Sequence, residues 1–417
     1  MNADRVIFHC DCNSFYASVE LLSHPELRDV PVAVCGDPEN RHGIILAKNE
    51  PAKRFGIQTA ETVYSALRKC PNLTLLPPHH DRYRAKSRQV NAIYARYTDR
   101  VEPFGIDESW LDMTGTWRLF GASPKEVADQ IRRVVREETG LTLSVGVSFN
   151  KVFAKLGSDY KKPYATTVIG PDDFKRIVWP LPVESLLYVG RATQKTLAGL
   201  GVRNIGQLAG ADPGQLQQAL GKLGGELRRY ALGEDDAPVR TAGEQPEVKS
   251  VGNNMTFRRN LVSRDDVVTG VTALSDEVAA RLRAHGLLCT VVQVLIKDTD
   301  LRSITRQAPV PAPTHLARDI ARAALALVDK NWPAGKPIRM LSVTAMGLTD
   351  GTDARQLSLL EPEPQSDEKR EHLEKSLDAI RKKYGKTSIA SASRLNNDLG
   401  LGPLAIRPPA EEEDPEP

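Results

Sequence analysis

Two adjacent carboxylates, Asp107 and Glu108, stand inside the apolar stretch 102–112, and this pair constrains the fold of the chain more than any other feature. In a strand, Ile106 and Glu108 point to one face and Asp107 to the other, so acids beside a core need either a cation or an exposed turn between strands. For an isolated acidic pair, an exposed hairpin tip is the usual explanation.

A third acid, Asp11, favours the cation. It directly follows the apolar segment Val6–Cys10. Carboxylates from two apolar strands suit Mg²⁺, which takes few protein ligands and leaves positions for water and substrate phosphates. The sequence therefore predicts a two-metal phosphoryl-transfer site at Asp11, Asp107 and Glu108.

Length and composition limit the class of protein. At 417 residues, with 41% hydrophobic and 26% charged residues, the chain is predicted to form several globular domains. It has no apolar run of ~18 residues and no signal-peptide pattern, which predicts a cytoplasmic protein without a membrane contact. The five cysteines are odd in number and scattered, which argues against a disulfide framework. Cys10 and Cys12 lack a second pair of ligands at zinc spacing.

The first half of the chain predicts a ferredoxin-like core with an insertion. Val6–Cys10 is predicted to be a strand, and a helix over Phe15–Leu22, capped by Ser14 or Asn13, would offer free N–H groups for a triphosphate beside Asp11. A small basic subdomain is predicted from strands at 32–35 and 43–47 and helices at 51–55 and 62–69. A helix over 81–97, strands within 101–114, a helix over 123–138 and a strand over 141–148 complete the β-α-β-β-α-β order.

A group of polar residues follows the last of these strands. Asn150 and Lys151 have two interpretations, an ordinary helix cap with a surface lysine or a phosphate-binding site. The same predicted helix carries Lys155, and two further lysines before Pro163, Lys161 and Lys162, favour phosphate binding.

The second half predicts contact with a polyanion. Short helices separated by glycines begin near Leu181, and they fit either a small helical bundle or hairpins that present amides to phosphates. Beyond a linker at 242–247, strands are predicted at 249–257, 290–297 and 338–346, and helices at 267–284 and 314–329. Basic residues outnumber acidic ones between Lys249 and Arg339, which indicates phosphate contact.

The C-terminal part contains a short apolar cluster at 355–360 and a charged helix predicted over 367–384. The cluster could serve as a docking peptide or pack on its own domain. The net charge is +3, and the last residues, 411–417, are acidic and proline-rich, so the rest of the chain is more basic.

The order of these motifs resembles the Y-family DNA polymerases, in particular the DNA polymerase IV (DinB-like) branch, over 6–360. The three matching motifs are Asp11–Glu20, Ile106–Asp112 and Ser148–Lys155. The resemblance implies an α+β right hand with a ferredoxin-like palm (1–18 and 76–165), small fingers (19–75), a helix-hairpin-helix thumb (166–241), an α/β little finger (242–350) and a tail (351–417) with a clamp-binding motif.

It also implies residue roles. Two Mg²⁺ ions would be held by Asp11, Asp107, Glu108 and the backbone carbonyl of Cys12. Nucleotide contacts would come from Asn13, Ser14, Phe15, Tyr16 as the steric gate, Lys53 and Lys162. DNA would be held by Gly190, Thr193, Gly221, Gly224, Lys249, Arg258, Arg259, Arg302, Arg306 and Arg339. The sliding clamp would bind Gln356, Leu357, Leu359 and Leu360.

Four positions depart from the pattern of the family. Asn13 replaces a frequent Asp, Gly105 a usual Ser, Lys53 a common Arg, and Leu360 the typical terminal Phe of a clamp motif. The stretch 47–53 also lacks the usual Thr and Tyr phosphate contacts.

The predicted function is error-prone translesion DNA synthesis by a monomer acting on primer-template DNA and dNTPs. One alternative is a nucleotidyl cyclase, which shares paired acids on a ferredoxin-like core but would not need the glycine hairpins or the basic region. Another is a clamp-tethered DNA-binding protein with little or no polymerase activity, against which the intact acids weigh.

Overall fold

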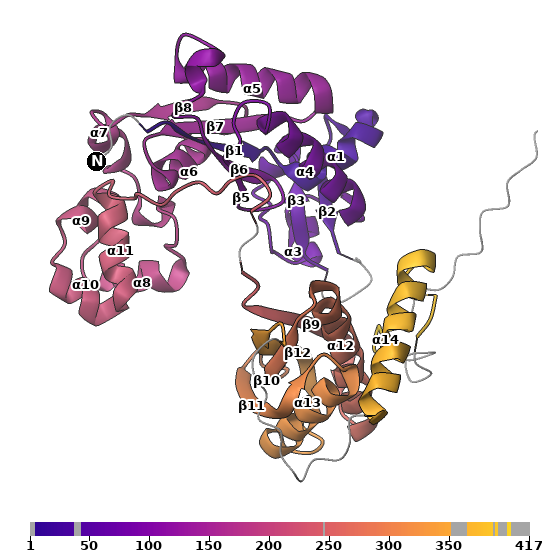
Figure 1. Cartoon of the computed structure of the whole chain (residues 1–417). Coiled ribbons are helices and arrows are strands. Elements are labelled where there is room, and N and C mark those ends of the chain that lie inside the picture. Colours follow the sequence, from indigo (N-terminus) through magenta and orange to yellow (C-terminus); the bar gives the residue numbers. More distant parts are fainter. Residues whose placement is uncertain are drawn as a thin grey trace, which may run out of the picture. The chain divides into compact units, whose positions relative to one another are not determined.

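The computed structural model describes residues 5–36, 43–244, 247–351, 365–386, 388–390 and 398–401. The chain divides into two compact units, 1–245 and 246–417 (Figure 1). The predicted clamp-binding stretch 356–360 and the acidic end 411–417 lie outside the described residues.

The first unit is built on a five-stranded sheet with the order β5-β6-β1-β7-β8. The strands are β1 Ile7–Cys12, β5 Val101–Pro103, β6 Glu108–Asp112, β7 Leu143–Ser148 and β8 Thr166–Ile169. β1 lies antiparallel to both β6 and β7. This is the strand order of a ferredoxin-like core, so the predicted fold class is confirmed. β8, parallel to β7, was not predicted.

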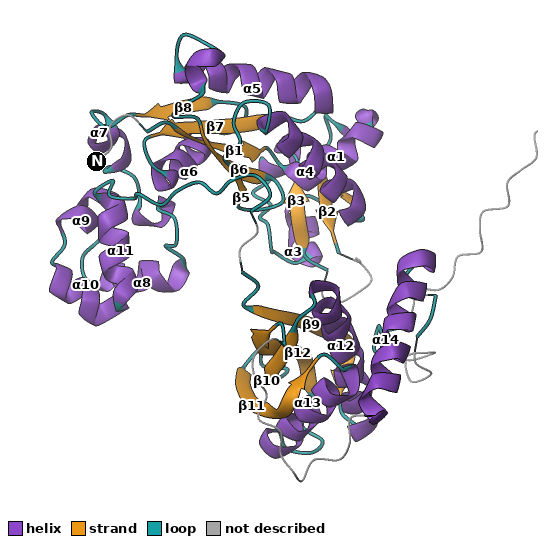
Figure 2. Ribbon diagram, viewed as in Figure 1, coloured by secondary structure: helices purple, strands orange, loops and turns teal. Residues whose placement is uncertain are grey.

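Helices cover both faces of this sheet (Figure 2). On one face, α4 (His80–Tyr94) and α5 (Pro124–Thr139) pack on Phe8 and Cys10 of β1. On the other face, α6 (Lys151–Tyr160) packs on Ile7. Because side chains alternate along a strand, His9 and Asp11 share the α6 face with Ile7.

The close approach of α6 depends on a glycine of β7. A Cβ atom at Gly146 would lie 1.9 Å from the carbonyl oxygen of Ala154 and 2.5 Å from the backbone nitrogen of Ser158, both in α6. No side chain other than hydrogen fits between the sheet and this helix. The helix therefore lies near enough to the sheet for its Lys155 to reach Asp11 of β1.

The helix α1 (Phe15–Ser23) begins differently from the prediction. Ser14 has a left-handed backbone with φ 50° and makes no side-chain cap. The side chain of Asn13 hydrogen-bonds Ser144 and Thr142 instead. The predicted side-chain cap is wrong, because the short polar side chains before the helix are turned into the fold.

A smaller sheet follows α1, with the order β3-β2-β4. Its strands are β2 Val32–Cys35, β3 Ile45–Lys48 and β4 Thr74–Leu76, of which β4 was not predicted. The short helix α2 spans Glu50–Lys53, and α3 spans Val63–Lys69. Asn49 and Thr62 cap these helices with their side chains. A 3₁₀ turn, η1, lies at Pro25–Leu27.

The rest of the first unit is helical. Its elements are η2 Trp117–Leu119, α7 Phe174–Val178, η3 Val183–Ser185, α8 Arg191–Gly199, α9 Ile205–Gly210, α10 Pro213–Leu220 and α11 Lys222–Ala231. Except for η2, whose Trp117 packs on the core of the large sheet, they share one apolar core that includes Phe153 and Leu227. The predicted short helices separated by glycines are confirmed.

The second unit has a four-stranded sheet with the order β11-β10-β12-β9, packed on α12 (Arg264–His285) and α13 (Ala317–Asn331). The strands are β9 Ser250–Leu261, β10 Leu288–Lys297, β11 Ser303–Thr314 and β12 Ile338–Thr349. β11 was missed because it contains Pro309, Pro311 and Pro313. Proline is tolerated there because β11 is an edge strand.

The predicted charged helix forms as α14, Gln365–Tyr384. Arg283 of α12 forms ion pairs with Glu374 and Asp378, and Arg381 pairs with Asp276 at 2.9 Å. These contacts join α14 to the second unit. None of the described helices combines the length and the apolar character that crossing a membrane requires.

Candidate active site

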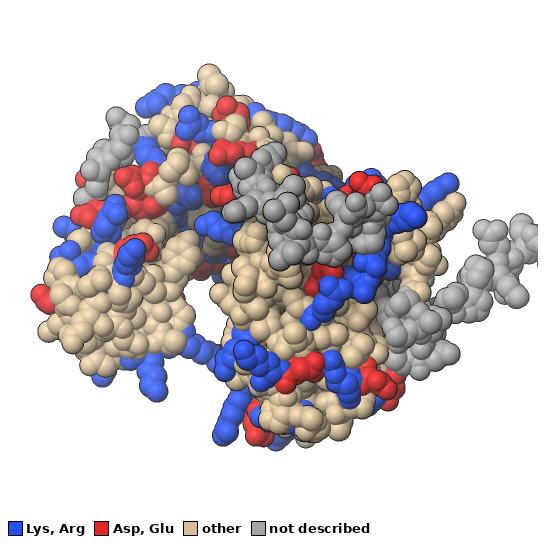
Figure 3. Space-filling model, turned by 60° about the horizontal axis from the view of Figure 1, so that its bottom comes forward, with Lys and Arg blue, Asp and Glu red and all other residues tan. Residues whose placement is uncertain are grey.

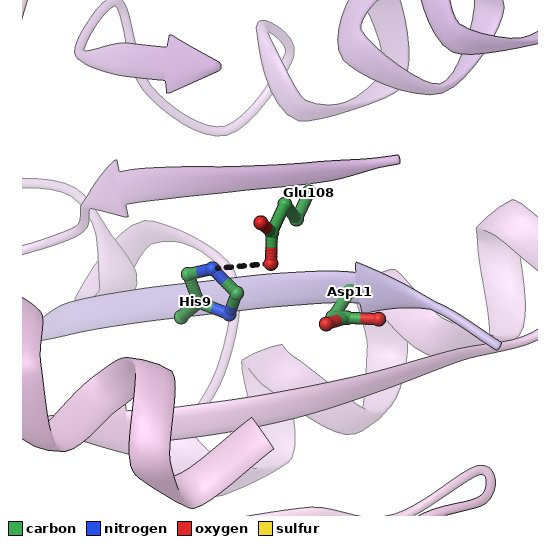
Figure 4. A group of neighbouring side chains, drawn as sticks. All are labelled: His9, Asp11 and Glu108. Carbon is green, nitrogen blue, oxygen red and sulfur yellow. Dashed lines mark ion pairs between the residues drawn. The ribbon is translucent and has the colours of Figure 1, made fainter. Parts of the chain in front are cut away.

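The three predicted acids meet at one end of the large sheet. Asp11 of β1 lies directly opposite Glu108 of β6 in the antiparallel pairing. The carbonyl of Asp107 accepts a hydrogen bond of 2.9 Å from the backbone N–H of Cys12. All four residues line a cavity of about 510 Å³. Figure 4 shows Asp11 and Glu108 extending from neighbouring strands, with His9 beside them.

Two ammonium groups from α6 and the loop after it contact the acids. Lys155 Nζ lies 3.2 Å from Asp11 Oδ2 and 2.6 Å from Glu108 Oε2. Lys162 Nζ lies 2.8 Å from the same Asp11 oxygen. Burial alone would lower the pKa of each lysine, but nearby carboxylates, Asp11 first, raise both above the ordinary value. Both lysines therefore stay charged at neutral pH.

The carboxylates differ in their electrostatics. Burial, followed by the charges of Asp11 and Glu108, raises the pKa of Asp107 to about 6. Burial also works to raise the pKa of Glu108, but contacts with His9 and Lys155 outweigh it and lower that pKa to about 2. The site thus keeps Glu108 ionised and leaves the charge of Asp107 incompletely compensated.

His9 was not predicted as part of the site. It is fully buried, and its Nδ1 lies 2.9 Å from Ser158 Oγ. Its Nε2 faces Glu108 Oε2 at 3.4 Å, the contact dashed in Figure 4, and hydrogen-bonds no described residue. The signal in the sequence was its place two residues before Asp11, on the same face of the strand.

The acidic cluster fits a divalent cation, with one imidazole nitrogen beside its carboxylate oxygens. His9, Asp11 and Glu108 offer ligand atoms that all lie within 4.8 Å of one another. The ammonium group of Lys155 bridges Asp11 and Glu108, which indicates that the carboxylates require a cation. Carboxylate oxygens with space for water and phosphate fit this ion.

Aromatic side chains line the cavity beside the acids. Tyr16 stacks on Tyr83 with ring centroids 4.1 Å apart and an interplanar angle of 12°. The hydroxyl of Tyr83 donates a hydrogen bond to the buried carboxylate of Glu20. Phe15 and Tyr16 both line the cavity. Burial, followed by the charge of Asp107, raises the pKa of Tyr16, so its hydroxyl stays protonated.

The smaller sheet contributes polar groups to the same cavity. The predicted nucleotide contact Lys53 lines it and pairs with Glu50 at 2.5 Å. Lys48 and Thr59 also line it and hydrogen-bond each other at 3.0 Å; they were not predicted as site residues. Asn13 and Ser14 line it as well, and Ser14 Oγ is buried without a hydrogen-bond partner among the described residues.

The polar residues that follow β7 have two different environments. Asn150 is the N-cap of α6, and its side chain also donates to the carbonyl of Gly233. Lys151 pairs with Glu102 at 2.7 Å and lies over the ring of Trp110. For these two residues the phosphate-binding interpretation is wrong. Lys162 does line the cavity.

The predicted DNA contacts in the helical region all lie at helix starts. Gly190 precedes α8, Thr193 lies in its first turn, and Gly221 precedes α11 with φ 60°. Gly224 is buried, and a Cβ atom there would lie 2.4 Å from the carbonyl oxygen of Leu216. Gly224, in the first turn of α11, therefore allows close packing on α10, and its contact with DNA stays a prediction.

The predicted DNA contacts in the second unit differ in exposure and in the partners that they have within the fold. Lys249, Arg258, Arg302 and Arg306 are exposed, and Arg339 is half-buried. Arg259 forms hydrogen bonds of 2.8 Å to both oxygens of Asp266 and another of 2.6 Å to Asp398, so its guanidinium is used within the fold. Figure 3 shows Lys and Arg side chains dispersed among Asp and Glu on the displayed face.

Paired carboxylates on a ferredoxin-like sheet are the arrangement of metal-dependent nucleotidyl-transfer enzymes. Two family models match the chain: the impB/mucB/samB family over residues 10–159 and its C-terminal domain over 248–359. The chain belongs to the impB/mucB/samB family, and it is a Y-family polymerase of the DinB-like branch.

Relatives and one solved structure agree with this assignment. A DNA polymerase IV of Acetivibrio thermocellus is 46% identical over 95% of this chain and 99% of its own length. DNA polymerase IV 1 of Bacillus subtilis is 36% identical over 94% of each. A solved Y-family DNA polymerase chimera has the same fold, with a TM-score of 0.72 and 20% identity over 82% of this chain and 98% of its own.

Proposed function

We propose that this protein is a DNA-directed DNA polymerase that performs translesion synthesis, transferring dNMP from a dNTP to a primer 3′-hydroxyl. One observation carries the proposal: the carboxylates of Asp11, Asp107 and Glu108 converge on a cavity that also holds Tyr16 and Lys162. Membership of a family whose curated relatives are DNA polymerases IV supports it.

The acids would hold two Mg²⁺ ions, with Asp11 serving both and the carbonyl of Cys12 completing the set. When bound, these ions activate the primer hydroxyl and neutralise the triphosphate. Asp107, just before β6, and Glu108, its first residue, would chiefly position the catalytic metal ion. Lys162 lies 2.8 Å from Asp11 and lines the cavity, so it could donate hydrogen bonds to a triphosphate bound there. Lys53 lines the side of the cavity that the smaller sheet forms.

Tyr16 would act as the steric gate. Its ring is held by the stack on Tyr83, which is in turn held by Glu20. A ring fixed in this way excludes a ribose 2′-hydroxyl by volume, because it cannot move aside without leaving the stack. Phe15, nearly fully buried beside it, would support the sugar.

The parts of the chain would divide as in a right hand: palm 1–18 and 76–165, fingers 19–75, thumb 166–241, little finger 242–350 and tail 351–417. Primer-template DNA would contact the helix starts at Gly190 and Gly221 and the exposed basic residues of the second unit. A sliding clamp would bind 356–360. We further propose that the protein acts as a monomer in the cytoplasm.

Primer extension tests the proposal. Purified protein is supplied with Mg²⁺ and dNTPs on an undamaged template and on a template with a minor-groove guanine adduct, beside Asp107→Ala. We expect extension on both templates and none by the variant, with DNA binding retained. Binding without extension by the unaltered protein would favour the clamp-tethered DNA-binding protein instead.

A further inference from the structure

Asp159, at the end of α6, contacts both lysines that contact the candidate metal ligands. Lys155 Nζ lies 3.4 Å from Asp159 Oδ2, and Lys162 Nζ lies 2.7 Å from Asp159 Oδ1. The helix places Lys155 and Asp159 four residues apart on one face, whereas Lys162 reaches Asp159 from the loop that follows α6. Each ammonium group is therefore shared between Asp159 and the acids of the sheet.

The carboxylates that contact the two lysines differ in solvent exposure. The side chain of Asp11 is 10% exposed and that of Glu108 is 17% exposed, whereas that of Asp159 is 50% exposed. Asp159 is not among the residues that line the cavity, although Asp11 and Glu108 are. It can hold an ammonium group without occupying the space in which a nucleotide and metal ions would lie.

Divalent cations and these lysines compete for the same oxygens. Lys155 lies 3.2 Å and Lys162 2.8 Å from Asp11 Oδ2. A metal ion on that oxygen would lie within a few ångströms of both ammonium groups and would repel them. Metal binding at Asp11 therefore requires the lysines to withdraw from it.

We propose that Asp159 is a positioning residue that receives the ammonium groups of Lys155 and Lys162 when divalent cations occupy the acidic cluster. This inference rests on the proposed metal site. Without Asp159, the lysines have only the acids of the sheet as partners, so they compete more strongly with the metal. Asp159 thereby favours metal binding without being a ligand.

Binding of Mn²⁺ alone to the full chain, followed by electron paramagnetic resonance of the free ion, tests this inference without a measurement of activity. We expect Asp159→Asn to weaken Mn²⁺ binding roughly two- to fivefold, the size of one partly exposed charge contact. Asp159→Glu should restore most of the affinity, because it keeps the charge. Unchanged binding by Asp159→Asn would overturn the inference.

A second comparison separates action through the lysines from a general effect of charge. In a chain carrying Lys155→Met and Lys162→Met, Asp159→Asn should have little further effect on Mn²⁺ binding. An equal loss in both backgrounds would overturn the inference, since the carboxylate would then act directly on the ion. If the unaltered chain shows no Mn²⁺ binding that Asp11→Asn removes, the proposed metal site itself fails.

Discussion

Replacing Gly146 with alanine should separate α6 from the sheet. The added Cβ atom would lie 1.9 Å from the carbonyl oxygen of Ala154, 2.5 Å from the nitrogen of Ser158 and 2.8 Å from the carbonyl carbon of Gly157. All three obstacles are backbone atoms, which cannot rotate aside. An ordinary contact needs about 3.4 Å, so the helix must retreat by roughly 1.5 Å.

This displacement has two measurable consequences. Overpacking against rigid backbone should lower the free energy of unfolding by about 3 kcal/mol, at the upper end of the range for such substitutions. The same retreat would lengthen the 2.6 Å contact between Lys155 and Glu108 beyond hydrogen-bonding distance. Because α6 carries both Lys155 and Asp159, the retreat would also shift this pair relative to Asp11 and Glu108, so primer extension should fall further than the unfolded fraction accounts for.

Urea unfolding followed by circular dichroism measures the first consequence. Gly115→Ala is the matched control, because no described atom lies within 4 Å of a Cβ atom at that position. A Gly146→Ala chain as stable and as active as the control would refute the claim that close packing of α6 positions the lysines.

Three further predictions concern other parts of the chain. In α11, Gly224→Ala should lower the free energy of unfolding by about 2 kcal/mol, because the added Cβ atom clashes with α10. Gly225→Ala should raise it by about 0.5–1 kcal/mol, because no described atom lies within 4 Å of a Cβ atom there. Equal urea unfolding curves for the two variants would contradict this prediction. Tyr16→Ala should reduce discrimination against rNTPs roughly 10- to 100-fold, and unchanged incorporation ratios would exclude the gate. Hydrogen bonds from Arg259 lower the pKa of Asp266, although burial alone would raise it. Asp266→Asn should therefore lower the free energy of unfolding by about 1–3 kcal/mol at pH values above the ordinary carboxyl pKa. This loss should shrink as the pH falls toward the lowered pKa, as urea unfolding at several pH values would reveal.

The sequence predicted the fold class and the family because their signals are local. Apolar strands ending in acids, glycine-separated helices and three long motifs can all be read without knowing which segments meet. The roles assigned to Asp11, Asp107, Glu108 and Tyr16 remain predictions, although the structure brings these residues to one cavity.

The features that were missed depend on long-range contacts. The cap expected from Asn13 was lost to hydrogen bonds with Ser144 and Thr142, more than a hundred residues away. The pairing of Arg259 with Asp398 could not be inferred locally, because 139 positions separate these residues in the sequence. β11 was hidden by prolines that an edge strand tolerates.

Single-nucleotide incorporation tests the central claim most directly. Each of the four dNTPs is offered with Mg²⁺ opposite each templating base, with the unaltered chain and with Asp107→Asn. We expect the incorporated nucleotide to follow the template, and we expect the variant to bind the same DNA but to incorporate at least ~100-fold more slowly, a loss of about 3 kcal/mol. Incorporation that ignores the template, or a variant as fast as the unaltered chain, would contradict it.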